Sequence, residues 1–466
     1  MAVNEERRPV GEEWVDPVFA PVRRIPKPTP WERPAGNWFM KEEDQIAVRR
    51  RLGEALRAAA PDDVHKRGQV NRSKELREGD MLFEAKQRTR TAPKKPGERD
   101  FAFYDSAAGP EYDLYRDLAN GWIKELPEAD RAQIIARMQK GDSLQYQATL
   151  AELTIHAALK RRGYNVRLHP TCIHATRKPD FEVQSAETKP IAIVEVTTFN
   201  PAQDEIAQAQ RDAAVYNALD KARLPAGWRI GLDVVKHGEK PAALGKICRG
   251  VETWATQVVG EDPLAMPTKT FDADDWSIEI RLYGGYKKDV PPERMIATAM
   301  GDVRLIKPHQ EIRQAVQFKG SRYGAMTLPY LIVVADCKED LQGGRIGDAA
   351  LEAMFGTIVT DVWKDKNGKT IMKDRRAAHG YWGTPDAPKH RDVSGIVILP
   401  KPHLWDLRNE RWQPILLRNP WAEQPLPDEL LPLPSFAYES DYFEPKDGTK
   451  LADMLGLPAT WPPEGT

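Results

Sequence analysis

Three acidic residues in the middle of the chain have types and spacing that could bind a cation: Glu152, Asp180 and Glu195. Glu195 interrupts the apolar run 191–196, which predicts a buried strand. An ionised carboxylate in such a strand is costly unless it is paired or bound to a metal. Two carboxylates about 4 Å apart also repel each other by roughly 4 kcal/mol at an effective dielectric near 20. The cluster therefore requires a proton, a basic partner or a divalent cation.

A helix and two strands must bring these carboxylates together. The spacing of apolar residues predicts a helix over 144–162, with Asp142 as its N-cap and Gly163 as its end. Glu152 lies on the face of this helix that should touch a sheet. If strands at 180–183 and 191–197 pair as a hairpin, Asp180 and Glu195 can come within a few ångströms of each other.

The same alternation of strands and helices continues along the chain and predicts an α/β fold. The strand at 330–335 is uniformly apolar, which predicts a central position in the sheet. Residues 361–393 are polar and are interpreted as loop. The remaining expected elements are a strand at 164–168, a helix at 204–223, a strand at 229–235, a helix at 242–259, a strand at 276–283, helices at 309–323 and 351–355, and strands at 394–399 and 412–417.

Composition limits the class of protein. The chain has 466 residues and a formal net charge of -1, and no apolar run approaches the roughly 18 to 20 residues of a membrane-spanning helix. Charged residues at 5–8 stand where a signal peptide would need an apolar stretch. Cys172, Cys248 and Cys337 are widely spaced and are interpreted as buried thiols. We therefore expect a cytoplasmic protein with no membrane contact, in which any nucleic-acid surface arises from local charge.

Proline-rich ends and a basic tract predict three parts: an N-terminal arm and basic helical extension at 1–141, a core at 142–418 and a proline-rich C-terminal tail at 419–466. One exposed helix is expected at 41–60. The tract 65–100 contains 11 Lys or Arg and 6 Asp or Glu, and it includes Lys94 and Lys95. It can be a solvated linker or an arm that contacts phosphates.

The helix with Glu152, the strand with Pro179-Asp180 and the strand with Glu195-Val196-Thr197 together resemble the PD-(D/E)XK nuclease superfamily, whose members are restriction-endonuclease-like. The resemblance covers about residues 143–235, and the segments 318–323, 329–334 and 418–422 are similar to uncharacterised members. It implies a mixed central sheet flanked by helices. It also implies that Asp180, Glu195 and the carbonyl of Val196 hold Mg²⁺ or Mn²⁺, ions that suit hard oxygen ligands.

The sequence departs from the superfamily pattern at one position, because Thr197 stands where the pattern has lysine. Threonine can align a water molecule but supplies no positive charge. Lys319 is the candidate substitute, since it shares the inward face of its expected helix with Ile312 and Val316. Lys319 can also be a residue at the edge of the core that extends to solvent. Lys178, beside the Pro-Asp pair, is a second candidate.

The expected function is metal-dependent hydrolysis of phosphodiester bonds in nucleic acid, with DNA as the expected substrate. Arg161, Arg162, Arg177 and Lys178, with Lys94 and Lys95, are the expected phosphate contacts. For this superfamily, antiviral defence is the expected setting. The alternative is a catalytically inactive scaffold or nucleic-acid-binding subunit, suggested by Thr197 and the long proline-rich ends, which could bind a partner protein or a second copy. A protein with no nucleic-acid role is a third interpretation, which rests on the neutral net charge.

Overall fold

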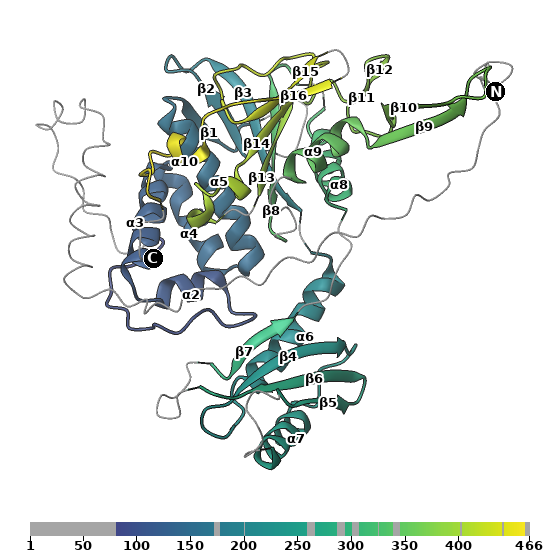
Figure 1. Cartoon of the computed structure of the whole chain (residues 1–466). Coiled ribbons are helices and arrows are strands. Elements are labelled where there is room, and N and C mark those ends of the chain that lie inside the picture. The colour runs from purple at the N-terminus through teal and green to yellow at the C-terminus, as the bar shows by residue number, and fades with distance from the viewer. Residues whose placement is uncertain are drawn as a thin grey trace, which may run out of the picture.

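The computed structural model describes residues 81–171, 178–199, 201–258, 266–286, 294–300, 307–324, 326–338, 345–400, 403–439 and 442–461. In this part the chain is a mixed α/β protein with two main sheets, one of eight strands and one of four (Figure 1). The expected helix at 41–60 and residues 65–80 of the basic tract lie outside the described residues. Among the helices of the described part, none is both long and apolar enough to cross a membrane.

The eight-stranded sheet is mixed, as expected. Its order is β1-β2-β3-β8-β13-β14-β15-β16; β3, β8 and β13 run parallel to one another, and antiparallel pairs flank them. Every residue of β8 is buried, which confirms the predicted central strand. The bounds are β1 Asn165–Leu168, β2 Phe181–Gln184, β3 Pro190–Phe199, β8 Tyr330–Asp336, β13 Gly395–Pro400, β14 Ile415–Arg418, β15 Ser435–Glu439 and β16 Tyr442–Lys446.

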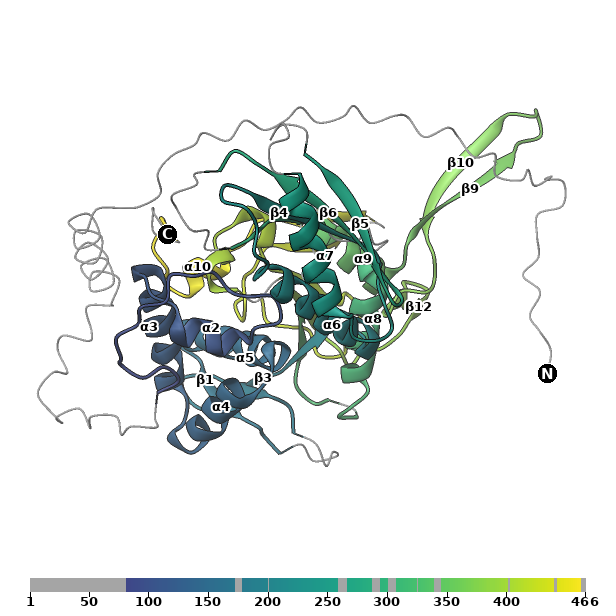
Figure 2. The same cartoon turned by 90° about the horizontal axis from the view of Figure 1, so that it is seen from below.

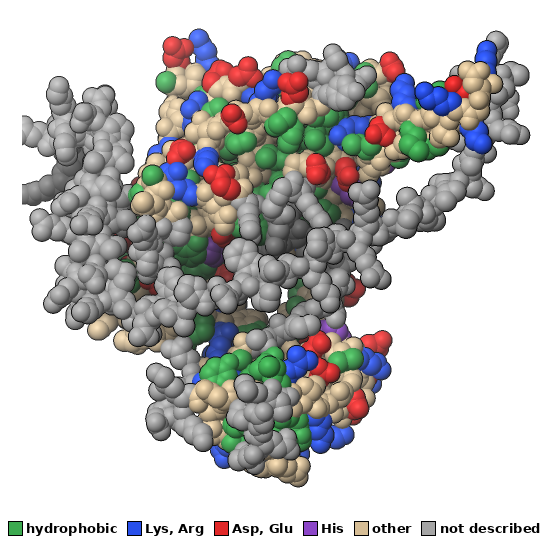
Figure 3. Space-filling view, in the orientation of Figure 1, with side chains coloured by type: hydrophobic (Ala, Val, Ile, Leu, Met, Phe, Trp, Pro, Cys, Tyr) green, Lys and Arg blue, Asp and Glu red, His purple; other side chains and the backbone are tan. Residues whose placement is uncertain are grey.

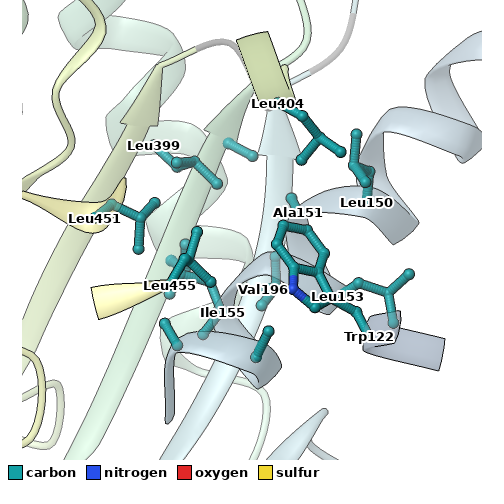
Figure 4. Close-up of a cluster of buried hydrophobic side chains, with 14 of the residues drawn as sticks. Trp122, Leu150, Ala151, Leu153, Ile155, Val196, Leu399, Leu404, Leu451 and Leu455 are labelled. Atoms are coloured by element: carbon teal, nitrogen blue, oxygen red, sulfur yellow. The ribbon is translucent and has the colours of Figure 1, made fainter. Parts of the chain in front are cut away.

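Helices cover both faces of this sheet, and the alternation of side chains along β3 divides its residues between two cores. Val194 and Val196 belong to the core under α5, where Figure 4 shows Val196 beside Leu153 and Trp122. Ile193 and Phe199 pack on the opposite face, under α8 and α9. The first core also contains residues of α2 Asp100–Ser106, α3 Pro110–Glu125, α4 Glu128–Lys140, α5 Ser143–Arg161 and α10 Leu451–Met454; the second contains residues of α8 Pro308–Gly320 and α9 Arg345–Phe355.

Helix α5 begins and ends where its sequence predicts, because its capping signals are local. The Asp142 carboxylate accepts the backbone N–H of Gln145 at 2.8 Å, which confirms the expected N-cap. Gly163 follows the helix with a φ of 88°, in the left-handed region that favours glycine. This helix carries Glu152 across the face of the sheet.

A second lobe is inserted between β3 and α8 (Figures 1 and 2). Its sheet has the order β5-β6-β4-β7, and its core is a separate apolar cluster. Its elements are α6 Gln203–Leu219, β4 Arg229–Lys236, α7 Leu244–Gln257, β5 Thr268–Ala273, β6 Trp276–Tyr283 and β7 Ile296–Met300. The range expected to form one core, 142–418, therefore contains two sheets with separate cores.

The two ends of the described chain belong to the main core, in contrast to the expected arm and tail. Helices α2 to α4 contribute to the same cluster as α5. The proline-rich segment adds β15 and β16 to the sheet and buries Leu430, Leu451 and Leu455. Pro445 is accommodated because β16 is an edge strand, where a missing N–H breaks no ladder. Elements on both sides of the expected boundaries at 141 and 418 therefore share one core cluster and one sheet.

The interpretation of 361–393 as loop is wrong. Strands β9 (Ile358–Lys364) and β10 (Thr370–Arg376) form a hairpin in that region, and β11 (Gly383–Thr384) pairs with β12 (Ala387–Pro388). Gly368 closes the hairpin turn with a φ of 76°. Polar side chains lie on both faces of this hairpin, so the alternation that marks a half-buried strand is missing. Two short 3₁₀ turns follow, at Leu404–Asp406 and Glu410–Trp412.

Candidate active site

Glu195 lies on β3 with only 1% of its surface exposed, and four neighbouring groups contact its carboxylate. The Tyr323 hydroxyl donates to Oε2 at 2.8 Å, and the backbone N–H of Asp180 donates to the same oxygen at 3.2 Å. Lys319 forms an ion pair with Oε1, and Arg322 Nη1 lies 3.4 Å from that oxygen. The basic partner that a buried Glu195 requires is therefore present.

Helix α8 and the turn that follows it supply these partners. Pro308 is in the first turn of α8, and Ile312 and Val316 pack inward at i, i+4 spacing. Lys319 comes one position before the last residue of the helix on the same side, with 14% of its side chain exposed. A Cβ on Gly320 would lie 2.0 Å from the Tyr381 hydroxyl, so glycine is required where the helix ends. The inward orientation of Lys319 matches the prediction from sequence.

Arg322 and Tyr323 were not among the expected site residues, although a signal for them exists. They follow Lys319 at i+3 and i+4, the spacing that places side chains on one side of a helical turn. Burial raises the pKa of Tyr323, and the charge of Glu195 raises it further, so its hydroxyl stays protonated and can donate.

Asp180 immediately precedes the first residue of β2, and its side chain continues the strand ladder. The backbone pairing of β2 with β3 reaches Phe181 and Val194, and the Asp180 carboxylate then accepts the N–H of Val196 at 2.7 Å. Burial raises the pKa of Asp180 to about 7, with further contributions from the negative charges of Glu195 and Glu152. The three carboxylates expected to cluster are therefore close enough to influence one another.

Glu152 approaches this cluster from α5 and forms an ion pair with Arg137 of α4, a partner that the sequence did not suggest. Burial raises the pKa of Glu152, while the charges of Arg137, His169 and Lys319 lower it. Arg137, Glu152 and His169 also line a small pocket under β1 and β2. Glu152 is thus half-buried and close enough to Asp180 to influence its pKa, and Arg137 is its ion-pair partner.

Thr197 lies two residues beyond Glu195 on β3 and points to the same face of the sheet. It is half-buried, opposite Val334 of β8. The position that carries lysine in the PD-(D/E)XK pattern therefore presents a neutral hydroxyl, and the lysine that contacts Glu195 is Lys319, on a different element.

The carboxylate oxygens of this cluster are the type of ligand that a hard divalent cation prefers. Asp180 and Glu195 supply carboxylate oxygens, and Mg²⁺ usually takes one or two carboxylates and keeps several waters. Within the described ranges no group of three or more His, Cys, Asp or Glu side chains is arranged to hold a metal ion. Lys319 and Arg322 also lie against the same Glu195 oxygen. Asp180 and Glu195 therefore offer oxygen atoms of the kind that Mg²⁺ or Mn²⁺ prefers, while both oxygens of Glu195 already accept from protein donors.

The expected phosphate contacts are distributed over several places. At the end of α5, Arg161 pairs with Glu125 and donates to the Leu455 carbonyl, and Arg162 donates to the Glu429 carbonyl. Both therefore hold the C-terminal segment in place. Lys178 is exposed, and its carbonyl accepts the Tyr323 hydroxyl at 3.2 Å, which places it beside the carboxylate cluster. Arg177 lies outside the described residues.

The described part of the basic tract, 81–100, is largely neutralised by internal ion pairs. Lys86 and Arg88 pair with Asp105, Arg90 pairs with Glu98, and Lys94 pairs with Asp100. Lys95 is exposed, and its backbone N–H donates to Glu98. These side chains hold the segment on the surface of the core.

Comparisons with protein-family models, curated proteins and solved structures found no match to this chain. The function must therefore be inferred from the geometry of the site.

Proposed function

We propose that this protein is a cytoplasmic nuclease that hydrolyses phosphodiester bonds of nucleic acid, DNA in the first place, at a PD-(D/E)XK-like site. The observation that supports this most is the contact of Lys319 with Glu195, beside an Asp180 whose pKa is raised to about 7. Perturbed carboxylates next to a lysine are typical of sites that handle charge during a reaction. In this proposal the protein acts in antiviral defence.

The proposed roles follow from position. Asp180, Glu195 and the carbonyl of Val196 would hold Mg²⁺ or Mn²⁺, which when bound polarises a phosphate and lowers the pKa of a water molecule. Lys319 provides the positive charge for a phosphate that gains negative charge in the transition state. The Thr197 hydroxyl orients the attacking water. Arg322 and Tyr323 hold the Glu195 carboxylate in place.

Glu152 acts electrostatically on Asp180, and burial raises its own pKa, so in this proposal it can take part in proton transfer. Arg137 keeps it in position. Lys178, exposed at the entrance to β2, is the described basic residue best placed to contact a phosphate of the substrate.

The test is a cleavage assay with the full-length protein, using linear, circular and single-stranded DNA, and RNA, with Mg²⁺, Mn²⁺ or chelator. We expect cleavage by the wild type only with metal, and none by Asp180→Ala or Glu195→Ala. Glu279→Gln, on the second sheet, is the matched control and should cleave normally. Cleavage by the Asp180→Ala/Glu195→Ala double variant would contradict the proposal.

A second candidate, a catalytically inactive nucleic-acid-binding or scaffold subunit, is favoured by one observation. The Glu195 carboxylate already has Lys319, Arg322 and Tyr323 as partners, and Thr197 supplies no charge. Such a subunit could bind a partner protein or a second copy through its N-terminal arm and C-terminal segment. Calorimetric Mg²⁺ or Mn²⁺ binding that disappears in Asp180→Asn would count against this function. Cleavage gained in Thr197→Lys but absent from the wild type would support it.

A further inference from the structure

The β9–β10 hairpin projects from the rest of the molecule, and no other labelled element packs along it in either view (Figures 1 and 2). Each strand has seven residues and is therefore about 23 Å long. Residues on both faces remain accessible: 60% of Ile358 and 69% of Met372 are exposed on one face, and Lys373 is exposed on the other. A two-stranded hairpin is marginally stable alone, so an arm of this length that none of the described elements covers suggests a binding surface.

The hairpin carries excess positive charge. Residues 358–376 contain six Lys or Arg and three Asp, and Figure 3 shows basic side chains gathered there. The three carboxylates are engaged within the hairpin. Asp361 pairs with Arg375 at 2.7 Å, Asp374 accepts the Thr360 hydroxyl at 2.6 Å, and Asp365 accepts backbone N–H groups of the turn.

Four lysines of the hairpin stay exposed, and none forms an ion pair with a described residue: Lys364, Lys366, Lys369 and Lys373. Lys366 and Lys369 lie at the turn, while Lys364 and Lys373 lie on opposite faces of the strands. Exposed cations at the end and on both faces of an arm suit a polyanion that surrounds the arm, as the two walls of a nucleic-acid groove would.

We propose that the β9–β10 hairpin enters the major groove of duplex DNA and holds the substrate of the proposed nuclease, an inference that rests on the proposed function. An antiparallel pair of strands is about 5 Å between strand axes, and the major groove, about 12 Å wide, admits a two-stranded ribbon. The four lysines contact phosphates on both sides, and Met372 contacts the groove floor. A second copy of this chain is a poorer occupant, because two basic hairpins repel each other.

The base of the hairpin is joined to the helix that carries Lys319. Arg313 of α8 donates to the His379 carbonyl, just past β10, at 2.8 Å. Further along the chain, the Tyr381 hydroxyl lies against Gly320 at the end of α8. Arg313 and Lys319 are separated by about 9 Å of helix. A duplex held by the hairpin would therefore lie on the side of the molecule that carries α8.

The experiment measures binding of a 30-base-pair duplex to the full-length protein over a range of salt concentrations, with chelator present to prevent cleavage. Alanine at Lys364, Lys366, Lys369 and Lys373 should weaken binding at least tenfold and lower the slope of log K against log salt by about 3 to 4. Arginine at the same positions should restore binding. The matched control replaces four exposed lysines of the second lobe, Lys221, Lys236, Lys240 and Lys246, with alanine, and should change affinity less than twofold.

Three results would overturn the inference. Unchanged duplex binding by the alanine variant leaves the nuclease proposal intact but excludes the hairpin. If the wild type binds and cleaves single strands but does not bind the duplex, the nuclease proposal also stands and the hairpin is excluded as a duplex-binding element. Dimerisation that is lost in the alanine variant while DNA binding is kept would assign the hairpin to a second copy. Conversely, loss of duplex binding in the alanine variant of a protein that never cleaves supports the hairpin and contradicts the proposed nuclease.

Discussion

The two sheets of this protein differ in what they bury. Among the described residues, the buried polar and charged side chains all lie outside the inserted lobe: Asp100, Arg116, Thr149, Thr154, His156, Glu195, Asp336, Ser394 and Asn419. The four-stranded sheet has an apolar core of residues such as Ile278 and Trp276. A buried charge lowers stability unless it is paired, and a stable sheet needs none, as the inserted lobe demonstrates. The difference identifies the eight-stranded sheet as the place where chemistry is to be sought.

The largest effect is expected at Glu195. Glu195→Gln keeps the size of the side chain but removes the charge, and should reduce metal-dependent cleavage by a factor on the order of 10³ or more. Glu279→Gln, on the inserted sheet, should leave the cleavage rate within twofold. Similar rates for both variants in single-turnover assays would remove the functional difference between the two sheets.

Core truncations should separate the sheets by stability. Ile332→Ala, opposite Glu195 on β8, and Ile278→Ala, on β6, should each lower the free energy of unfolding by about 2–5 kcal/mol, because both side chains are fully buried. Hydrogen exchange should localise the loss of protection to the sheet that carries the change. Only Ile332→Ala should also slow cleavage. Equal loss of protection in both sheets after Ile278→Ala would show that the two cores unfold as one unit.

A variant of Lys319 tests whether a lysine on α8 supplies the positive charge that the PD-(D/E)XK pattern places on the strand, where this chain has Thr197. Lys319→Met retains an unbranched apolar stem, and should lower the cleavage rate roughly 10²- to 10³-fold without a matching change in DNA affinity. Lys246→Met, exposed on α7, is the control of equal charge. A wild-type rate for Lys319→Met would assign Lys319 a purely structural role as the partner of Glu195.

A further effect is a pH dependence of stability at Asp180. Its pKa rises from 3.8 to about 7 on folding, so between these values the folded state binds a proton that the unfolded state has lost, and stability falls as pH rises. Asp180→Asn removes this penalty. With chelator present, the variant should be more stable than the wild type by about 4 kcal/mol at pH 8 and by less than about 1 kcal/mol near pH 4, as denaturant unfolding can measure.

The same titration predicts that metal affinity increases as pH passes about 7, because the ion binds the ionised carboxyl. Calorimetry of Mg²⁺ binding at pH 6 and pH 8 measures this change in affinity.

The stability experiment has its own contradicting outcome. If the stability difference between Asp180→Asn and the wild type does not change with pH, the pKa of Asp180 is the same in the folded and the unfolded chain.

Local signals in the sequence were sufficient for several features. The capping of α5 by Asp142, the central position of β8 and the paired strands with Asp180 and Glu195 all follow from short-range patterns. The hairpin at 358–376 was missed because neither of its faces is buried, and alternation is only visible when one face is. Strands β15 and β16 within the proline-rich segment were not expected, because proline occurs in irregular backbone and in edge strands alike.

By itself, the sequence determined the α/β class, the order of the site residues along the chain and the inward face that carries Lys319. Periodicity and capping are local properties of a segment, and they act before any long-range contact forms. Only the tertiary structure decided that Lys319 reaches Glu195 across 124 positions, that Arg137 pairs with Glu152 and that the chain between β3 and α8 forms a second core. Those facts depend on which surfaces pack together, because the burial that makes a charge require a partner exists only after the sheets and helices have assembled.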